Sequence, residues 1–174
     1  RVPGNAGDIR AMRFVSVLDA SLGQGPLAVL TPNTVFSCNA PVDRTIWQSM
    51  TNPILTESLI SNGGLSQDSS ILANGDLFFR AMDGLRSLLL ARRDFASWGN
   101  VPISQEVSDT LAADDEALLA LSRALVFDNR LLATVHPQQD AQGVYHDTLV
   151  ALNFDPVSSL RGKAPSIYDG IWTG

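Results

Sequence analysis

Residues that could carry out acid–base or metal chemistry are few in this chain and widely spaced. Among 174 residues there are two histidines, His136 and His146, and one cysteine, Cys38. Zinc sites and catalytic triads combine several such side chains, so the chain has too few histidines and cysteines to favour either kind of site. His146 adjoins Asp147, but adjacent residues of a strand point to opposite faces of a sheet, which separates a base from its orienting acid. Both histidines are therefore interpreted as polar residues beside a loop, and Cys38 as a buried small apolar side chain.

Carboxylates are more numerous, but nothing in the sequence pairs any two of them. Glycoside hydrolases need two carboxylates that flank the scissile bond. The run 66–70 (SQDSS) partly matches the Ser-x-Asp-x-Gly box of sialidases but lacks its glycine and the following Thr-Trp, so Asp68 is predicted to be a structural corner. The acidic run 114–116 has no histidine near it and is expected to form an exposed helix end or loop. The sequence thus predicts no enzyme, with no catalytic residue, no cofactor-binding residue and no metal ligand.

Arginine and tryptophan are the strongest candidates for contact with another protein. Both residue types are enriched at interface hot spots. The alternative is a surface guanidinium that lies on a half-buried ring of its own chain. The candidate interface residues are Arg44, Trp47, Arg92, Arg93 and Trp98.

The elements that would position these residues are short strands joined by tight turns. Apolar runs are interrupted by Pro, Asn, Asp and Gly throughout the chain, a pattern typical of antiparallel hairpins. Hairpin turns are predicted at Pro32-Asn33, Asn74-Gly75 and Asp128-Asn129, and a further turn at Asp83-Gly84. The strands around them cover 27–31, 34–38, 70–73, 76–80, 85–90, 124–127, 131–135 and 144–154, with a polar loop at 137–143.

One short helix is predicted at 103–111, where apolar residues recur on one helical face and Ser104 can cap the first turn. Segments 40–52 and 98–102 are expected to be irregular loops that contact neighbouring subunits. Several strands are apolar on both faces, which predicts that they are covered on both sides. The predicted core consists of Leu27, Val29, Phe36, Ile71, Leu77, Phe79, Leu88, Val126, Leu132, Val150 and Leu152.

Composition limits the classes of partner. The chain carries 12 basic and 18 acidic residues, a net charge of -6. Nucleic-acid-binding domains are usually basic, so sequence-specific binding of DNA or RNA is not expected. No apolar stretch approaches the roughly 18 residues that span a bilayer, so no membrane span is expected. The chain opens on Arg1 rather than methionine and stops at Gly174 directly after a strand-like run, which suggests a piece of a longer protein.

Five runs follow one another in the last two thirds of the chain, before Ile171-Trp172. They are GLSQDSSI (64–71), GDLFF (75–79), DGLRSL (83–88), VPISQEV (101–107) and ALVFDNRLL (124–132). This succession, within 59–172, resembles the β-propeller virion proteins of tailed phages, of the tail hub, nozzle or packaged-DNA stabilisation type. That family is not enzymatic. The resemblance implies a structural role at the tail tip or head-to-tail region, a homo-oligomeric ring in contact with other virion subunits, and a place in the phage particle after assembly in the host cytoplasm.

The fold implied is all-β, with antiparallel hairpins that are part of a β-propeller and one short helix. Its blade-like units would be 20–58, 59–103 and 118–174 of a single domain, or of a fragment of one, over 1–174. A closed propeller needs at least about four blades, so three would leave two outer sheet faces uncovered. Two other classes stay open: a carbohydrate-active propeller with sialidase-like glycosidase activity, and a cellular propeller that acts as a protein-interaction scaffold.

Overall fold

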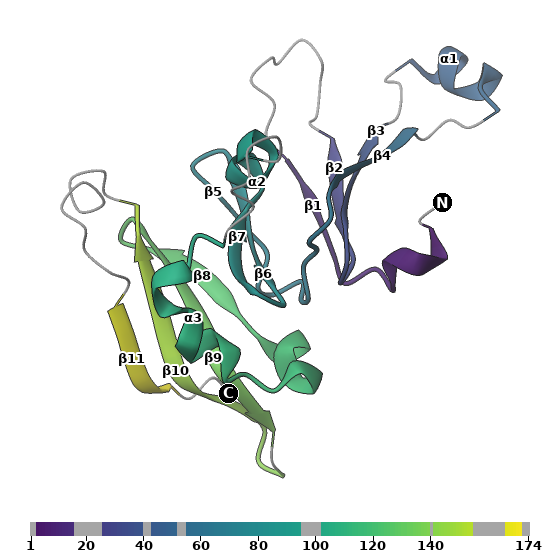
Figure 1. Cartoon of the computed structure of the whole chain (residues 1–174). Helices are drawn as coiled ribbons and strands as arrows, with labels where there is room; N and C mark the ends of the chain where they lie inside the picture. The colour runs from purple at the N-terminus through teal and green to yellow at the C-terminus, as the bar shows by residue number, and fades with distance from the viewer. Residues whose placement is uncertain are drawn as a thin grey trace.

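Three antiparallel sheets and a few short helices make up the described part of the chain (Figure 1). The computed structural model describes residues 3–15, 26–39, 43–51, 55–94, 102–139, 141–154 and 166–171. The N-terminal sheet contains β1 (Ala11–Phe14), β2 (Leu27–Leu30), β3 (Val35–Asn39) and β4 (Leu55–Ile60) in that spatial order. The middle sheet contains β5 (Ile71–Ala73), β6 (Asp76–Ala81) and β7 (Gly84–Ser87). The C-terminal sheet contains β8 (Ala124–Phe127), β9 (Arg130–Gln139), β10 (Val144–Asn153) and β11 (Ser166–Ile171).

The predicted hairpin turns are confirmed, with one shift of position. Thr31 and Thr34 close the turn around Pro32-Asn33 through a backbone hydrogen bond of 2.9 Å. Asn74-Gly75 have φ values of 51° and 78°, and Asp128-Asn129 have 48° and 55°. Positive φ at both central residues is the geometry of a primed turn, which matches the twist of the flanking strands. The fourth turn contains Met82 and Asp83 rather than Asp83 and Gly84, because Ala81 pairs with Gly84 in the β6–β7 ladder.

The polar loop predicted at 137–143 is wrong over its first half. β9 continues through Pro137 to Gln139, and Pro137 pairs with His146 of β10. β8 pairs with β9 only as far as Ala133, so the edge of β9 at Pro137 has no ladder partner in the described ranges. Proline lacks an N–H to donate and is tolerated at such an edge position.

Helices are more numerous than the one predicted, and part of a predicted strand is helical. The strand expected at 85–90 ends at Ser87, and α2 (Leu88–Asp94) begins there. Two side chains cap its free N–H groups: the Asp76 carboxylate accepts from Leu89 N at 3.0 Å, and Ser87 Oγ accepts from Leu90 N at 3.1 Å. The segment predicted to be irregular at 40–52 contains α1 (Arg44–Ser49). The short 3₁₀ helices η1 (Gly4–Ala6) and η4 (Glu116–Leu121) were not predicted either.

The helix predicted at 103–111 is present in shorter form, but its predicted cap is wrong. The structure has the 3₁₀ helix η3 (Gln105–Val107) followed by α3 (Ser108–Ala112). Ser104 makes no side-chain cap there. Its buried hydroxyl instead accepts the N–H of Leu85 in β7 at 2.9 Å, which ties the segment to the middle sheet.

Replacing Ser104 by Ala is expected to lower the free energy of unfolding by about 1–3 kcal/mol, because the buried Leu85 N–H would lose its acceptor. Urea denaturation measures the change. Ser108→Ala, at an exposed position in the same segment, should change stability by less than about 0.5 kcal/mol. Equal effects of the two substitutions would contradict the role given to Ser104.

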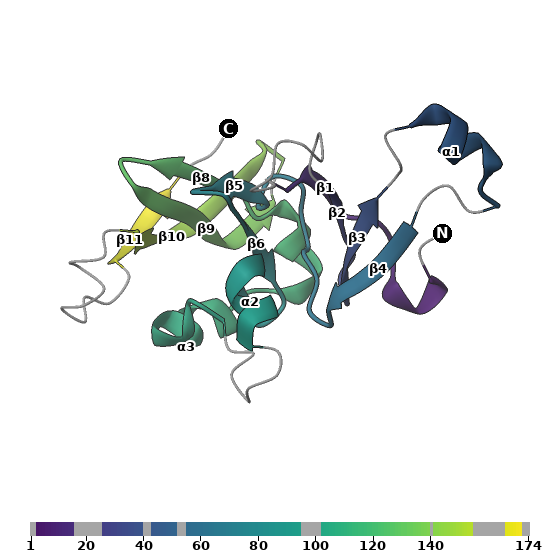
Figure 2. The ribbon, with the colours of Figure 1, turned by 90° about the horizontal axis from the view of Figure 1, so that it is seen from above.

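Strands β6 and β7 of the middle sheet are buried on both faces, because the three sheets are stacked in chain order (Figure 2). Leu77 and Phe79 belong to a core cluster shared with the N-terminal sheet, where Leu30 and Val35 are buried. Phe78, between them in β6, belongs to a second cluster shared with the C-terminal sheet. Alternate residues of one strand therefore face different neighbours, as the apolar residues on both faces of the strands predicted. The first strands β1, β5 and β8 lie along one side of the stack.

The core prediction is confirmed for seven residues: Val29, Phe36, Leu77, Phe79, Leu88, Val150 and Leu152. Leu27, Ile71 and Leu132 are only half-buried. Val126 is 41% exposed, and its assignment to the core is wrong. It lies on β8, the edge strand of its sheet. Cys38 is half-buried at the edge of the Val29–Phe36 cluster.

The described ranges form no closed ring of sheets, so the propeller itself stays a prediction, as do the blade-like units 20–58, 59–103 and 118–174. What is present is the coarser arrangement, antiparallel sheets with short helices. None of the helices in the described part of the chain is long and apolar enough to cross a membrane.

Candidate functional site

The segment 66–70, which contains the sialidase-like run, joins all three sheets at their first strands. The Gln67 side-chain amide pairs with the backbone of Met12 in β1: Oε1 accepts from Met12 N at 2.8 Å, and Nε2 donates to Met12 O at 3.2 Å. The carbonyl of Asp68 accepts from Ala124 N of β8 at 3.0 Å. The segment then leads directly into β5. Its residues therefore hold sheets that are distant in sequence, and the structural interpretation of Asp68 agrees with these backbone contacts.

Arg13 of β1 is fixed against the same segment. Its Nε donates to Ser70 O at 3.0 Å and to Ser70 Oγ at 3.2 Å, and Nη2 donates to Gln67 O at 2.9 Å. Ser70 is fully buried. These three bonds place a guanidinium in a defined orientation where the first strands meet.

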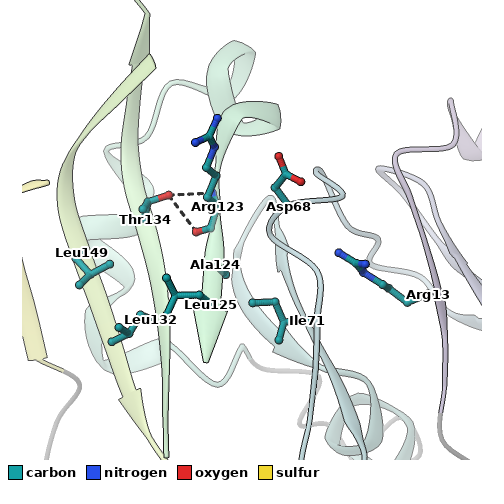
Figure 3. A pocket seen from close by; sticks show the side chains of 9 residues that line it. All are labelled: Arg13, Asp68, Ile71, Arg123, Ala124, Leu125, Leu132, Thr134 and Leu149. Atoms are coloured by element: carbon teal, nitrogen blue, oxygen red, sulfur yellow. Dashed lines mark hydrogen bonds between the residues drawn. The ribbon is translucent and has the colours of Figure 1, made fainter. Parts of the chain in front are cut away.

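A groove of about 460 Å³ lies at this junction (Figure 3). Arg13, Arg123 and Asp68 supply its charged groups. Its remaining lining residues are Ile71, Ala124, Leu125, Leu132, Thr134 and Leu149. Figure 3 shows Leu132 and Leu149 on one side of β8, and Ile71, Asp68 and Arg13 on the other. Asp68 is the one carboxylate among these described lining residues, and a glycosidase needs a pair about 5–10 Å apart, so the groove assembles no such pair.

Asp114 is buried in an ion pair, so the prediction of an exposed acidic run at 114–116 is wrong for its first residue. Its side chain is 1% exposed, and Oδ2 lies 2.8 Å from Nη2 of Arg80, also 1% exposed. Arg80 Nη2 also donates to Leu111 O at 3.2 Å, while Nε and Nη1 are buried without a partner. Burial lowers the pKa of the Arg80 guanidinium from its ordinary value, and the Asp114 carboxylate opposes that shift. Asp115 and Glu116 are exposed as expected, and Asp115 caps η4 through Ala117 N at 2.9 Å.

His136 lies beside this ion pair, within β9 rather than beside a loop. Its backbone N–H donates to Asp114 Oδ1 at 2.7 Å, and its ring Nε2 donates to Thr110 O at 2.8 Å. A carbonyl oxygen can only accept, so Nε2 carries a proton. The φ of His136 is 50°, an uncommon left-handed conformation that these contacts hold in place.

Asp114, His136 and Thr148 occur in the order of an acid, a base and a nucleophile, but their geometry does not favour that chemistry. His136 Nε2 lies 3.6 Å from Asp114 Oδ1, and Nδ1 lies 3.5 Å from Thr148 Oγ1. Thr148 is 5% exposed and lines no part of the described groove. Catalytic bases work within about 2.6–3.2 Å of the proton they take. The cluster is better explained as a structural link between the 110–114 segment, β6 and β9.

His146 lies in β10, close to the loop that joins β9 to β10 as predicted, but it is buried. The residue is 1% exposed, and its Nε2 lies 3.2 Å from Leu121 O. Within the described ranges, no group of three or more His, Cys, Asp or Glu side chains is placed to hold a metal ion.

The predicted interface residues are not gathered into one described surface. Arg44 and Trp47 lie on α1, which projects from the N-terminal sheet (Figure 1) and buries none of its residues. The Asp43 carboxylate caps this helix, and hydrogen bonds from the Thr45 side chain and N–H lower its pKa. Arg92 and Arg93 lie on α2, away from α1 in both views of the ribbon, and their side chains are outside the description. Trp98 lies outside the described residues.

Sequence reasoning missed Gln67, Arg80 and the role of Asp114. Arg80 stands between apolar residues in a buried strand, and a charged residue at such a position is the one signal that could have pointed to a buried partner. Gln67 has no comparable signal, because its partner Met12 is 55 residues away. Comparison of the chain with protein-family models and with curated proteins found no match.

Proposed function

We propose that this chain is a structural protein of the tailed-phage virion, a β-propeller component of the tail hub, nozzle or head-to-tail region that acts through subunit assembly. The observation that carries the proposed architecture is the stack of three antiparallel sheets in chain order, with the first strands along one side. Propeller blades are antiparallel sheets packed in this manner around an axis. The virion assignment depends on the sequence resemblance described above.

Open sheet faces at the two ends of the stack support an assembly role. On the C-terminal sheet, Leu125 and Phe127 are 52% and 68% exposed. On the N-terminal sheet, Met12 and Phe14 of β1 are both about half exposed. Exposed apolar groups at sheet edges favour association with further sheets, either from another copy or from other virion subunits.

Residues 1–174, expressed alone, are expected to self-associate in a concentration-dependent manner, because further sheets are needed to cover these faces. Multi-angle light scattering measures the mass. Polar substitution at Leu125→Thr with Phe127→Thr should shift the population toward monomer, whereas Ile9→Thr, at another exposed apolar residue, should not. A dilute, cooperatively melting monomer of the unaltered chain would contradict the assembly role.

Fractionation of the source lysate separates the virion assignment from a free cellular scaffold. A virion component should sediment with purified particles in a fixed copy number, as measured by quantitative mass spectrometry. Recovery only in the soluble fraction, without particles, would contradict the virion assignment and favour the scaffold.

A further inference from the structure

We propose that the groove beside β8 binds an extended apolar peptide segment that carries an acidic residue, and that this segment adds a strand to the free edge of β8. This binding deepens the assembly role proposed above, and it rests on that role in taking the ligand to be a segment of a protein partner. Three properties of the groove support it: the backbone of β8, the apolar lining and the placement of charge.

The backbone of β8 offers hydrogen-bonding groups to the groove side. Arg123 bonds toward β9, since its N–H and C=O both meet Thr134. Ala124, the next residue, donates its N–H in the opposite direction, to Asp68 O. Hydrogen-bonding direction alternates along a strand, so the N–H and C=O of Val126 also point away from β9. In the described ranges β8 pairs with β9 alone, which leaves Val126 as the ladder position open to an added strand.

The side chains around this edge suit alternating apolar residues of a peptide. Leu125 is an exposed residue of β8 itself, and Ile71 lies on the side of β8 away from β9, where the strand would be added. Leu132 of β9 and Leu149 of β10 continue the apolar lining behind β8. An added strand places every second side chain on the same face as Leu125. Main-chain bonds then contribute affinity, and contacts with Leu125 and Ile71 contribute specificity, as in other cases of strand addition.

The positive charge of the groove favours a ligand that carries an acidic residue. Two guanidiniums, of Arg13 and Arg123, line the groove against the single carboxylate of Asp68. Arg13 is held in place by Ser70 and Gln67, so little side-chain entropy is lost when a carboxylate binds beside it. No ion pair in the described ranges joins Arg123 to Asp68. The groove is therefore locally cationic in a chain whose net charge is -6.

The binding test uses fluorescently labelled synthetic peptides of alternating valine and threonine with one central residue varied. Fluorescence anisotropy with the full 1–174 chain should show the peptide with a central glutamate binding at least about tenfold more tightly than its lysine counterpart, because of the two guanidiniums. Equal affinity for the glutamate and lysine peptides would overturn the assignment of an acidic ligand. The absence of saturable binding below about 1 mM would overturn the site itself.

Two substitutions test the two halves of the recognition independently. Arg123→Gln should lower the affinity for the glutamate peptide by at least about tenfold and leave the affinity for the lysine peptide little changed. Val126→Pro removes the open N–H, which should abolish binding of both peptides, while edge strands tolerate proline. Arg130→Gln is the matched control: it removes an exposed guanidinium of β9 that does not line the groove. Circular dichroism and the melting temperature establish that each variant is folded.

Self-association is measured on the same samples, so that the two roles can fail separately. A chain that associates but binds no peptide retains the assembly role and loses the peptide site. A monomer that binds the glutamate peptide retains the site and loses the assembly role. If Val126→Pro dissociates the oligomer that the unaltered chain forms, a second copy of the chain binds the edge of β8. The assignment to an acidic partner segment is then overturned.

Discussion

Asp114→Asn is expected to lower the free energy of unfolding by about 3–5 kcal/mol, the usual cost when one member of a buried ion pair is removed. The guanidinium of Arg80 would stay charged at 1% exposure, with the neutral Asn amide in place of its counterion. Two of its nitrogens already lack partners, so no other described group compensates for the lost carboxylate. Urea denaturation followed by circular dichroism measures the change.

The neighbouring residue provides a matched control for this substitution. Asp115→Asn removes the same charge from an exposed residue whose capping bond to Ala117 an asparagine can also make, so a change below about 0.5 kcal/mol is expected. The double variant Arg80→Met with Asp114→Asn should recover most of the loss, because it removes the stranded charge while Asn can still accept the His136 N–H. Similar losses in Asp114→Asn and Asp115→Asn would show that the buried pair does not have the role given to it.

Phe79→Ala is expected to lower the free energy of unfolding by about 3–5 kcal/mol, the range for emptying an aromatic site in a core. Phe79 is 0% exposed and packs with Leu30, Val35 and Leu88, between the N-terminal and middle sheets. The loss has two parts: apolar area returns to water, and a cavity remains between two sheets that cannot collapse independently. The urea midpoint should fall with little change in the slope of the transition.

Phe127→Ala is the comparison for this second substitution. It deletes the same side chain at a residue that is 68% exposed on β8, so the expected loss is below about 1 kcal/mol. A loss below about 1 kcal/mol for Phe79→Ala as well would place Phe79 outside the core and contradict the stacking of the first two sheets.

The turns and much of the core were predictable because their causes are local. Asn74-Gly75 and Asp128-Asn129 tolerate positive φ, and this preference acts within the hairpin itself. The consecutive apolar residues 77–79 of β6 likewise indicated a strand covered on both faces. Helix α2 was missed because its first turn depends on Asp76, a capping acceptor 13 residues from Leu89 that no local pattern reveals.

The candidate site was much less predictable, because it is built from contacts between distant segments. Gln67 meets Met12 across 55 residues, and Arg80 meets Asp114 across 34. The acidic run 114–116 looks uniformly exposed in sequence, and only the docking of its first residue against β6 buries one carboxylate. Of the predicted interface residues, Arg44 and Trp47 have described side chains and neither lines the groove, because its lining comes from the first strands of all three sheets and from β9 and β10.

Local chemistry along the chain determined the antiparallel hairpins and their turns and indicated that β6 is covered on both faces, since turn preferences and runs of apolar residues act over a few residues. Tertiary structure alone decided which strands lie at the edge of a sheet and which charged side chains are buried. Val126 belongs to an apolar run of the kind found in core strands, yet it is exposed, because β8 is the edge strand of its sheet. Arginine is a residue type usually found at the surface, yet Arg80 is buried, because the packing of two sheets brings the Asp114 carboxylate to it. Burial depends on which sheet lies against a strand, and that is a property of the stack and not of the strand.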